Sequence, residues 1–168
     1  MPSDAIEAIG PNGRSLRVEF IWKGDRYAQL VSLIDARGAA KPLLESIEGT
    51  AHDAWPPSPP LQNLTIEIHP GDNRVALLLG MAGDAHWSAS IEATADKAAL
   101  VFDVACRHSA SPGALGSRYH RLTDSKDYFS IRGDSANLSQ NEGTLEIQPV
   151  AASTSAGTTR WRYEIKPG

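Results

Sequence analysis

Hydrophobic and polar residues alternate one by one along several segments of this chain. Residues 15–22 show the pattern first, with apolar Leu16, Val18 and Phe20 separated by charged residues. The same alternation returns at 64–68, 87–91 and 161–165. Successive side chains of a strand point to opposite faces, so each segment has one apolar and one polar face. This pattern is typical of antiparallel sheets that pack on a core with one side only.

The size and composition of the chain fit one globular domain over residues 1–168. Its 168 residues lie within the usual range of about 100–200 residues per domain. The content of 41% hydrophobic and 21% charged residues is ordinary for a folded protein and excludes a disordered chain. We therefore expect a hydrophobic core that needs no disulfide, and the single cysteine allows none within the chain.

Charge and hydropathy also restrict the partners and the compartment. The net charge of −4 argues against binding to nucleic acid or to anionic lipid. No segment approaches the roughly 20 apolar residues of a membrane-spanning helix, so no membrane partner is expected. The first residues are acidic and lack an apolar stretch, which predicts no secretory signal and a cytoplasmic location.

Turn-forming residues divide the alternating segments into about eight strands. Glycine beside aspartate or asparagine separates several of them and suits tight turns. Neighbouring strands joined in this way form a meander, which predicts an all-β domain folded as a β-sandwich or an open barrel. The strands are expected at 15–22, 27–34, 63–69, 74–80, 85–94, 98–107, near 127–132 and 143–149, and at 160–166.

Two segments favour short helical turns instead. Asp4 and Glu7 have the spacing of a capping box in residues 3–9, although a strand explains the same segment nearly as well. In the segment 42–49, a proline at the start, leucines and an isoleucine at helical spacing, and a glycine at the end predict one or two helical turns. Residues 108–126 are rich in glycine and polar residues and are expected to form a long loop.

Residues 75–79 are apolar at every position, so they are expected to form the most buried strand. Three tryptophans follow the apolar positions of strands, which predicts core packing for Trp22, Trp87 and Trp161. Cys106 also follows an apolar face and is interpreted as a buried, unreactive thiol. Asp103 lies on the opposite face of that strand and, if buried, is expected to pair with Arg107 or with an arginine of another strand.

Residues 55–60, Trp-Pro-Pro-Ser-Pro-Pro, cannot form a central strand or a helix, because four prolines lack backbone donors. They are expected to form an extended connection inside the domain. Trp55 then has two interpretations. It either binds a sugar ring or a protein groove, or it folds back over one end of the sheets.

The strongest candidate for chemistry is the segment 84–88. Asp84, His86 and Ser88 fall on one face of a strand, and carboxylate and imidazole groups are common metal ligands. A polar outer face of a strand explains the same residues. A serine nucleophile at Ser88 or Ser109 is a weaker hypothesis, because no G-x-S-x-G motif is present.

The expected loop 108–126 supplies further candidates for ligand binding, because binding groups often lie on loops held by a rigid scaffold. The sequence therefore predicts a noncatalytic module that binds a small molecule or a protein. The alternative is a metal-dependent enzyme for small molecules, with Asp84 and His86 as ligands at one end of the barrel. No cofactor is predicted, and a metal ion enters only in that alternative; a homodimer through strand edges is a third hypothesis. The candidate binding residues are His86, Ser88, Trp55, Arg118, Tyr119 and His120.

Overall fold

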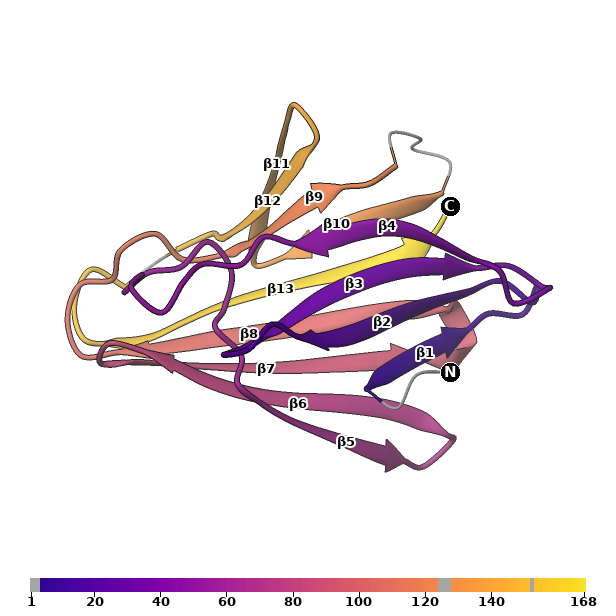
Figure 1. The fold of residues 1–168 in the computed structure, drawn as a ribbon, viewed down its shortest axis with the longest axis horizontal. Coiled ribbons are helices and arrows are strands. Elements are labelled where there is room, and N and C mark those ends of the chain that lie inside the picture. The colour runs from indigo at the N-terminus through magenta and orange to yellow at the C-terminus, as the bar shows by residue number, and fades with distance from the viewer. Residues whose placement is uncertain (1–3, 124–127, 152) are drawn as a thin grey trace.

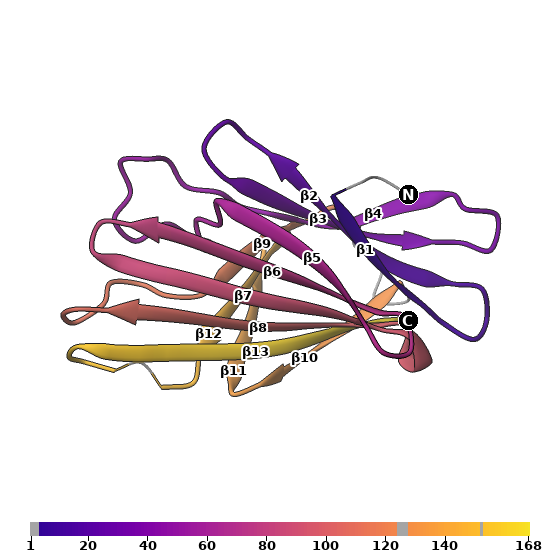
Figure 2. The same cartoon turned by 90° about the horizontal axis from the view of Figure 1, so that it is seen from below.

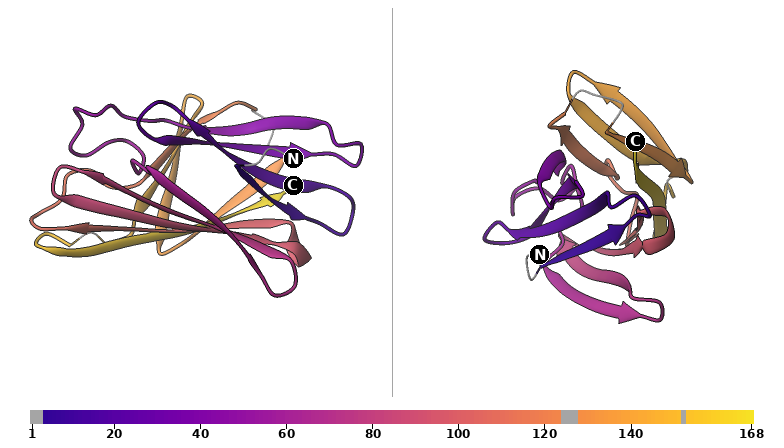
Figure 3. Two further views of the ribbon diagram at one scale, coloured as in Figure 1. Left: turned by 60° about the horizontal axis from the view of Figure 1, so that its bottom comes forward. Right: turned by 90° about the vertical axis from the view of Figure 1, so that its right-hand side faces the viewer.

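The protein is a sandwich of two antiparallel sheets (Figures 1 and 3). The computed structural model describes residues 4–123, 128–151 and 153–168. These residues form thirteen strands, and their only helical element is a single 3-10 turn, η1 (Ala95–Lys97). The all-β class and the packed sheets of the sequence-based prediction are confirmed.

The first sheet, called sheet A, has seven strands, and the second, sheet B, has six. Sheet A contains, in spatial order, β1 (Ala5–Ile9), β2 (Ser15–Trp22), β3 (Tyr27–Ile34), β4 (Ala40–Ser46), β9 (Ser117–Arg121), β12 (Thr144–Pro149) and β11 (Ala136–Asn141). Sheet B contains β10 (Phe129–Asp134), β13 (Gly157–Pro167), β8 (Ala99–His108), β7 (Ala85–Thr94), β6 (Asn73–Ala82) and β5 (Asn63–His69).

Long hairpins build most of sheet B. The strands β5, β6, β7 and β8 follow one another along the chain and in space, and β13 returns at the end of the chain to pair with β8 (Figure 2). In sheet A, β1 to β4 form a similar meander, while β9, β12 and β11 join from later in the chain. Both sheets are therefore meanders completed by strands that are distant in sequence.

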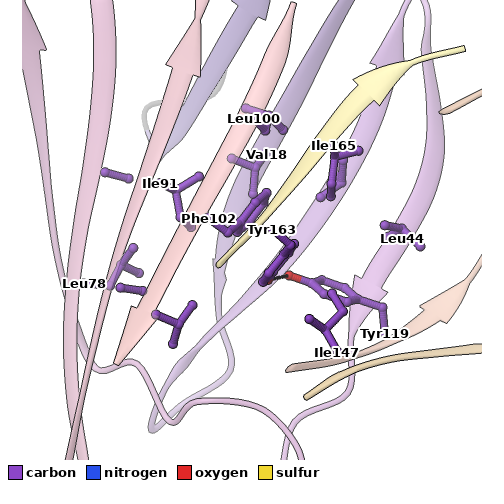
Figure 4. Packing of buried hydrophobic residues seen from close by; sticks show 14 of the residues in the cluster. Val18, Leu44, Leu78, Ile91, Leu100, Phe102, Tyr119, Ile147, Tyr163 and Ile165 are labelled. Carbon is purple, nitrogen blue, oxygen red and sulfur yellow. Dashed lines mark hydrogen bonds between the residues drawn. The ribbon is translucent and has the colours of Figure 1, made fainter. Parts of the chain in front are cut away.

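The core lies between the two sheets and contains the apolar side of each alternating strand. Leu16, Val18 and Phe20 of β2 are buried, as the alternation predicts. Figure 4 shows the centre of this layer, where the rings of Phe102 and Tyr163 stack with centroids 4.7 Å apart. Burial of apolar area of this kind is the main favourable contribution to folding.

A polar contact joins the two sheets inside this core (Figure 4). The hydroxyls of Tyr119, on β9, and Tyr163, on β13, lie 2.6 Å apart, and Tyr119 also donates to the side-chain oxygen of Gln29 at 3.2 Å. Nearby, Trp161 donates from its indole nitrogen to the hydroxyl of Ser117 at 3.0 Å. Because these buried groups have partners, they can lie in the core without a large desolvation cost.

Strand positions agree closely with the alternation. The strands at 15–22, 27–34, 63–69 and 85–94 have the predicted bounds. The segment 42–49 is different, because residues 40–46 form β4 rather than helical turns. β4 pairs with β3 on one side and β9 on the other, and a register shift at Val31/Ser32 leaves Leu43 as an extra residue. This bulge explains why Leu43 and its neighbour Leu44 are both buried in a strand.

Two other local predictions are wrong. The helical interpretation of residues 3–9 fails, because Ala5–Ile9 forms β1; residue 3 lies outside the described residues. The expected loop 108–126 contains β9, which pairs with β4 and β12; residues 124–126 lie outside the described residues. The polar edge strand β11 was not predicted, since Ala136–Asn141 has few of the residues that favour strands.

The outer side of β6 is exposed, contrary to the prediction for residues 75–79. Val75, Ala76 and Leu78 are buried, whereas Leu77 and Leu79 face solvent. Trp22 is also 51% exposed, because it lies at the end of its hairpin and contacts Tyr27 edge-on rather than the core. The other two strand tryptophans, Trp87 and Trp161, are buried as predicted.

The proline-rich segment crosses from sheet A to sheet B between β4 and β5 (Figure 1). Its prolines are largely buried, and Trp55 packs edge-on against Trp87 with centroids 5.8 Å apart. Gly113 fits against the same indole, since a Cβ at that position would lie 2.5 Å from it. Trp55 therefore covers one end of the core, which confirms the second interpretation of this residue.

Candidate ligand-binding groove on the outer face of sheet B

The strand register of sheet B brings residues from four strands into two neighbouring rows on its outer face. Residues paired directly across a sheet lie on the same face. The first row contains Leu79 (β6), Ser88 (β7), Ala105 (β8) and Arg160 (β13). The second row contains Met81, His86, Arg107 and Thr158 from the same strands in the same order.

A groove follows from the sizes of the side chains in the first row. Ser88 and Ala105 are small and form the floor, whereas Leu79 and Arg160 are large and form the walls. The walls are three strand spacings apart, or about 14 Å. This hollow has a volume of about 540 Å³ and opens to solvent. It lies within the size range of sites for small molecules.

One wall is apolar and is held in place by the chain that follows the proline segment. Leu79 is 57% and Met81 49% exposed, and with Leu77 they form a continuous apolar row on the outer face of β6. The side-chain amide of Gln62 donates to the carbonyl of Met81 at 3.2 Å and accepts from its backbone N–H at 3.1 Å. Below them, Gly80 packs on the backbone of Pro60 so closely that no Cβ would fit. The backbone of this wall is therefore fixed before any ligand arrives.

The opposite side of the groove is cationic. Arg107 and Arg160 are exposed and diagonal to each other on adjacent strands, and His86 lies directly across from Arg107. Within the part of the chain that the structure describes, neither arginine forms an ion pair. The residues that line the groove contain no aspartate or glutamate: Gln62, Asn63, Leu79, Gly80, Met81, His86, Trp87, Ser88, Ala105, Arg107, Thr158 and Arg160.

The candidates from the sequence do not gather at one place. His86 and Ser88 line the groove together, but Asp84 lies in the β6–β7 turn and lines a separate hollow of about 350 Å³ beside Trp55. Arg118 lines a third hollow of about 260 Å³, where it pairs with Glu146 at 2.9 Å.

The other two candidates of the segment 118–120 also lie away from the groove. Tyr119 is 1% exposed and points into the core, where its hydroxyl contacts Gln29 and Tyr163. His120 is exposed on sheet A, two residues beyond Arg118 on the same face of β9. The segment 118–120 therefore contributes nothing to the groove on sheet B.

The metal hypothesis finds no support in the arrangement of side chains. Among the described residues, no three histidine, cysteine, aspartate or glutamate side chains lie close enough together to hold a metal ion. His108, the histidine beside Asp84, has both ring nitrogens engaged, with Ala110 O at 2.8 Å and Thr159 Oγ1 at 3.0 Å. No hydrogen bond links Ser88 or Ser109 to a histidine in the described ranges, so neither is prepared as a nucleophile.

The inner side of the groove floor is inert. Cys106 points into the core beside Ala105, and its burial raises the pKa of the thiol to about 11.

Asp103 faces outward and lies 3.9 Å from Arg162 of the neighbouring strand, which confirms the expected ion pair. Neither residue contributes to the groove.

A second unusual polar cluster lies at the end of β4. Arg26 is almost fully buried and pairs with Asp25 at 2.8 Å, but its Nη1 atom has no partner among the described residues. Glu48 has a buried carboxylate oxygen, Oε1, that also lacks a partner in the described chain. Burial raises the pKa of Glu48 to about 7, although Ser46 and the charge of Arg26 partly oppose the shift. Because two buried polar atoms of this cluster lack partners in the described chain, it lowers the stability of the folded protein when Glu48 is charged.

Sequence reasoning found two groove residues and missed the others that define it. Arg107 and Arg160 stand in different strands, and only the register of β8 with β13 makes them neighbours. Leu79 falls in the segment 75–79, which the sequence predicts to be the most buried strand, and Met81 lies just beyond the strand predicted at 74–80. The available signal was the pair of small polar residues, Ser88 and Ser90, at successive outward positions of β7.

No helix in the described residues is long and apolar enough to cross a membrane. No protein-family model matches the chain, and no curated protein is significantly similar to it in sequence.

Proposed function

We propose that this protein is a noncatalytic binding module that holds a small molecule in the groove on the outer face of sheet B. The observation that carries the proposal is the groove itself: a small-residue floor between an exposed apolar wall and a wall of arginines that have no acidic partner among the described residues. Binding sites of this kind combine apolar contact area with a few polar groups that fix orientation.

The rigidity of the groove supports the same proposal. Its floor belongs to β7 and β8, which are interior strands of sheet B, and its apolar wall is held by Gln62 and Pro60. A preformed site binds without the cost of ordering its own chain. The arrangement contains polar groups for recognition but no nucleophile and base in contact, so we favour binding over catalysis.

Three six-carbon probes test the proposal: hexanoate, hexanol and hexylamine, added to the labelled protein and followed by NMR. At about 0.5 kcal/mol per heavy atom, well below the ceiling for small ligands, probes of this size should have dissociation constants of roughly 1 mM or weaker. At least one probe should shift the amide signals of Ser88 and Ala105. Ala105→Trp should fill the floor and abolish that binding.

The matched control is Val101→Trp, on the same face of the same strand and two rows away from the groove floor. It should leave the dissociation constant unchanged within about twofold, since four residues of strand span about 13 Å. Melting curves of both variants should show folded protein. Absence of binding by all three probes up to about 20 mM, or equal binding by wild type and Ala105→Trp, would overturn the proposal.

A further inference from the structure

We propose that the groove selects ligands in which an anionic group, a carboxylate or a phosphate, is joined to an apolar portion. Arg107 and Arg160 would bind the anion, and Leu79 and Met81 would contact the apolar portion. This inference rests on the proposed function and adds the chemical class of the ligand.

The first argument is the charge balance of the groove. The chain has 20 acidic and 16 basic residues, yet no acidic residue lines this hollow. The acidic residues nearest to it are Asp103, which lies one row from the floor and faces Arg162 at 3.9 Å, and Asp84, which lines the separate hollow beside Trp55. A concentration of positive charge in a protein with net charge −4 is a local feature that attracts anions over about one Debye length, 8–10 Å.

The second argument comes from the other cations on the same face of sheet B. Arg162 lies 3.7 Å from Asp134 and 3.9 Å from Asp103. Lys166 and Arg132 both contact Glu164, at 2.9 Å and 3.4 Å. Of the five cations on this face, Arg107 and Arg160 alone lack an acidic partner in the described residues. A bound anionic ligand would give Arg107 and Arg160 the negatively charged partner that the other three cations already have within the protein.

The third argument is the geometry of the two arginines. Thr158 lies directly across from Arg107, and Arg160 is two residues further along β13 on the same face. Diagonal side chains at this separation lie about 7–8 Å apart at their Cα atoms, within reach of long side chains that converge on one group. Guanidinium groups bind carboxylate and phosphate oxygens in pairs, and the hydroxyl of Thr158 adds a further donor between them.

The last argument is the contrast between the two walls. Arg107 stands on β8 and Arg160 on β13, whereas the exposed apolar side chains stand on β6. Between β6 and β13, only Ser88 and Ala105 form the floor. A simple inorganic anion would contact the cationic wall alone and leave Leu79 and Met81 exposed. A ligand with both a charged and an apolar end contacts both walls at once.

The test compares hexanoate and hexyl phosphate with hexanol, which has the same apolar chain and no charge. We expect the anions to bind at least about tenfold tighter than hexanol to wild type in roughly 0.15 M salt. Arg107→Gln/Arg160→Gln should weaken binding of the anions about tenfold or more and change hexanol binding by less than about twofold. The ratio between the two anions identifies the preferred group.

The control variant is Arg118→Gln/Arg132→Gln, which changes the net charge equally but removes arginines that already have acidic partners. It should retain anion binding within about twofold, since distant charges are screened by salt. Equal binding of hexanol and hexanoate, or preference for hexylamine, would overturn the anionic selectivity and leave the binding module in place. Absence of binding by every probe would remove both proposals together.

Discussion

Arg118, on the outer face of sheet A, and the two groove arginines of sheet B, Arg107 and Arg160, have different cross-strand neighbours. On sheet A, Arg118 lies directly across from Glu146, and their side chains are 2.9 Å apart. On sheet B, Arg160 lies across from Ala105, and Arg107 lies between His86 and Thr158. The identity of the cross-strand neighbour therefore determines whether an arginine is held within the protein or is free to contact a ligand. Exposure alone does not distinguish the two cases.

The same contrast extends to the other polar groups near sheet A. Tyr119 has partners inside the core, and Arg17 pairs with Glu7 at 3.0 Å. Glu48, just after β4, is the exception, because one of its buried oxygens has no partner among the described residues. Most of these groups near sheet A are therefore paired within the protein, whereas the groove on sheet B leaves Arg107 and Arg160 without an acidic partner among the described residues.

The largest expected effect comes from Glu48→Gln. Folding raises the pKa of Glu48 from 4.5 to about 7, so the folded state binds the proton more tightly than the unfolded state. Wild type should therefore lose stability as the pH rises from about 4.5 to 7, and the penalty should persist above that window. At about 1.4 kcal/mol per pKa unit, Glu48→Gln should raise the free energy of unfolding near pH 8 by roughly 3 kcal/mol.

Urea unfolding at several pH values measures this effect. The variant and wild type should have similar stability below about pH 3.5, where the carboxyl is almost entirely protonated in both states. Glu142→Gln, in the exposed β11–β12 turn, is the control and should follow wild type throughout. If the free energies of unfolding of Glu48→Gln and wild type depended on pH in the same way, the unpaired oxygen of Glu48 would carry no cost in stability.

The sequence suggested Tyr119 as a ligand contact, whereas the structure places it in the core. The substitution Tyr119→Phe tests which of these two roles the hydroxyl has. It removes the donor to Gln29 and a partner of Tyr163 in the core, which should cost about 1–3 kcal/mol of stability. Binding of hexanoate should stay the same, because Tyr119 points away from both outer faces. A changed dissociation constant with unchanged stability would contradict this assignment.

Ala105→Glu tests the contrast between the sheets directly. It places a carboxylate across from Arg160, as Glu146 stands across from Arg118. The new ion pair should weaken hexanoate binding at least about tenfold, equivalent to about 1.4 kcal/mol, while Ala105→Gln should have a smaller effect. Equal effects of the two substitutions would assign the loss to size rather than to charge.

The smallest effect is expected from Glu146→Gln, which frees Arg118. Because this pair is partly exposed, its loss should cost no more than about 1 kcal/mol, and less at high salt. Thermal unfolding at low and high salt measures the difference. A cost well above this value at high salt would mean that Glu146 has a structural role beyond the ion pair.

Sequence patterns predicted the sandwich better than the site, and particular residues show why. Alternation gave the bounds of β2 and β7 because each has one buried face. The bounds of β3 and β5 were also predicted, although β3 is buried on both faces and the apolar residues of β5 are at most half-buried. Alternation failed for β4, where a bulge produces two consecutive buried leucines, and for the polar edge strand β11. The local alternation of apolar and polar residues identifies a strand that packs on a core. It does not reveal a bulge or a polar edge strand.

The groove required information that no single segment contains. His86 and Ser88 could be found together because they belong to one strand. Arg107 and Arg160 become neighbours only through pairing between β8 and β13, which are about 50 residues apart in sequence. Arg118 is also an arginine whose partner the sequence does not reveal. Only the pairing of β9 with β12 shows that Glu146 lies across from it.

Mapping of amide chemical shifts during titration with hexanoate tests the central claim most directly. We predict that the perturbed signals belong to Ser88, Ala105, Arg107 and Arg160 and to their neighbours on β6, with those of Arg118 unchanged. Perturbations centred on β9 and β12, or spread evenly over both sheets, would contradict the assignment of sheet B as the ligand-binding face.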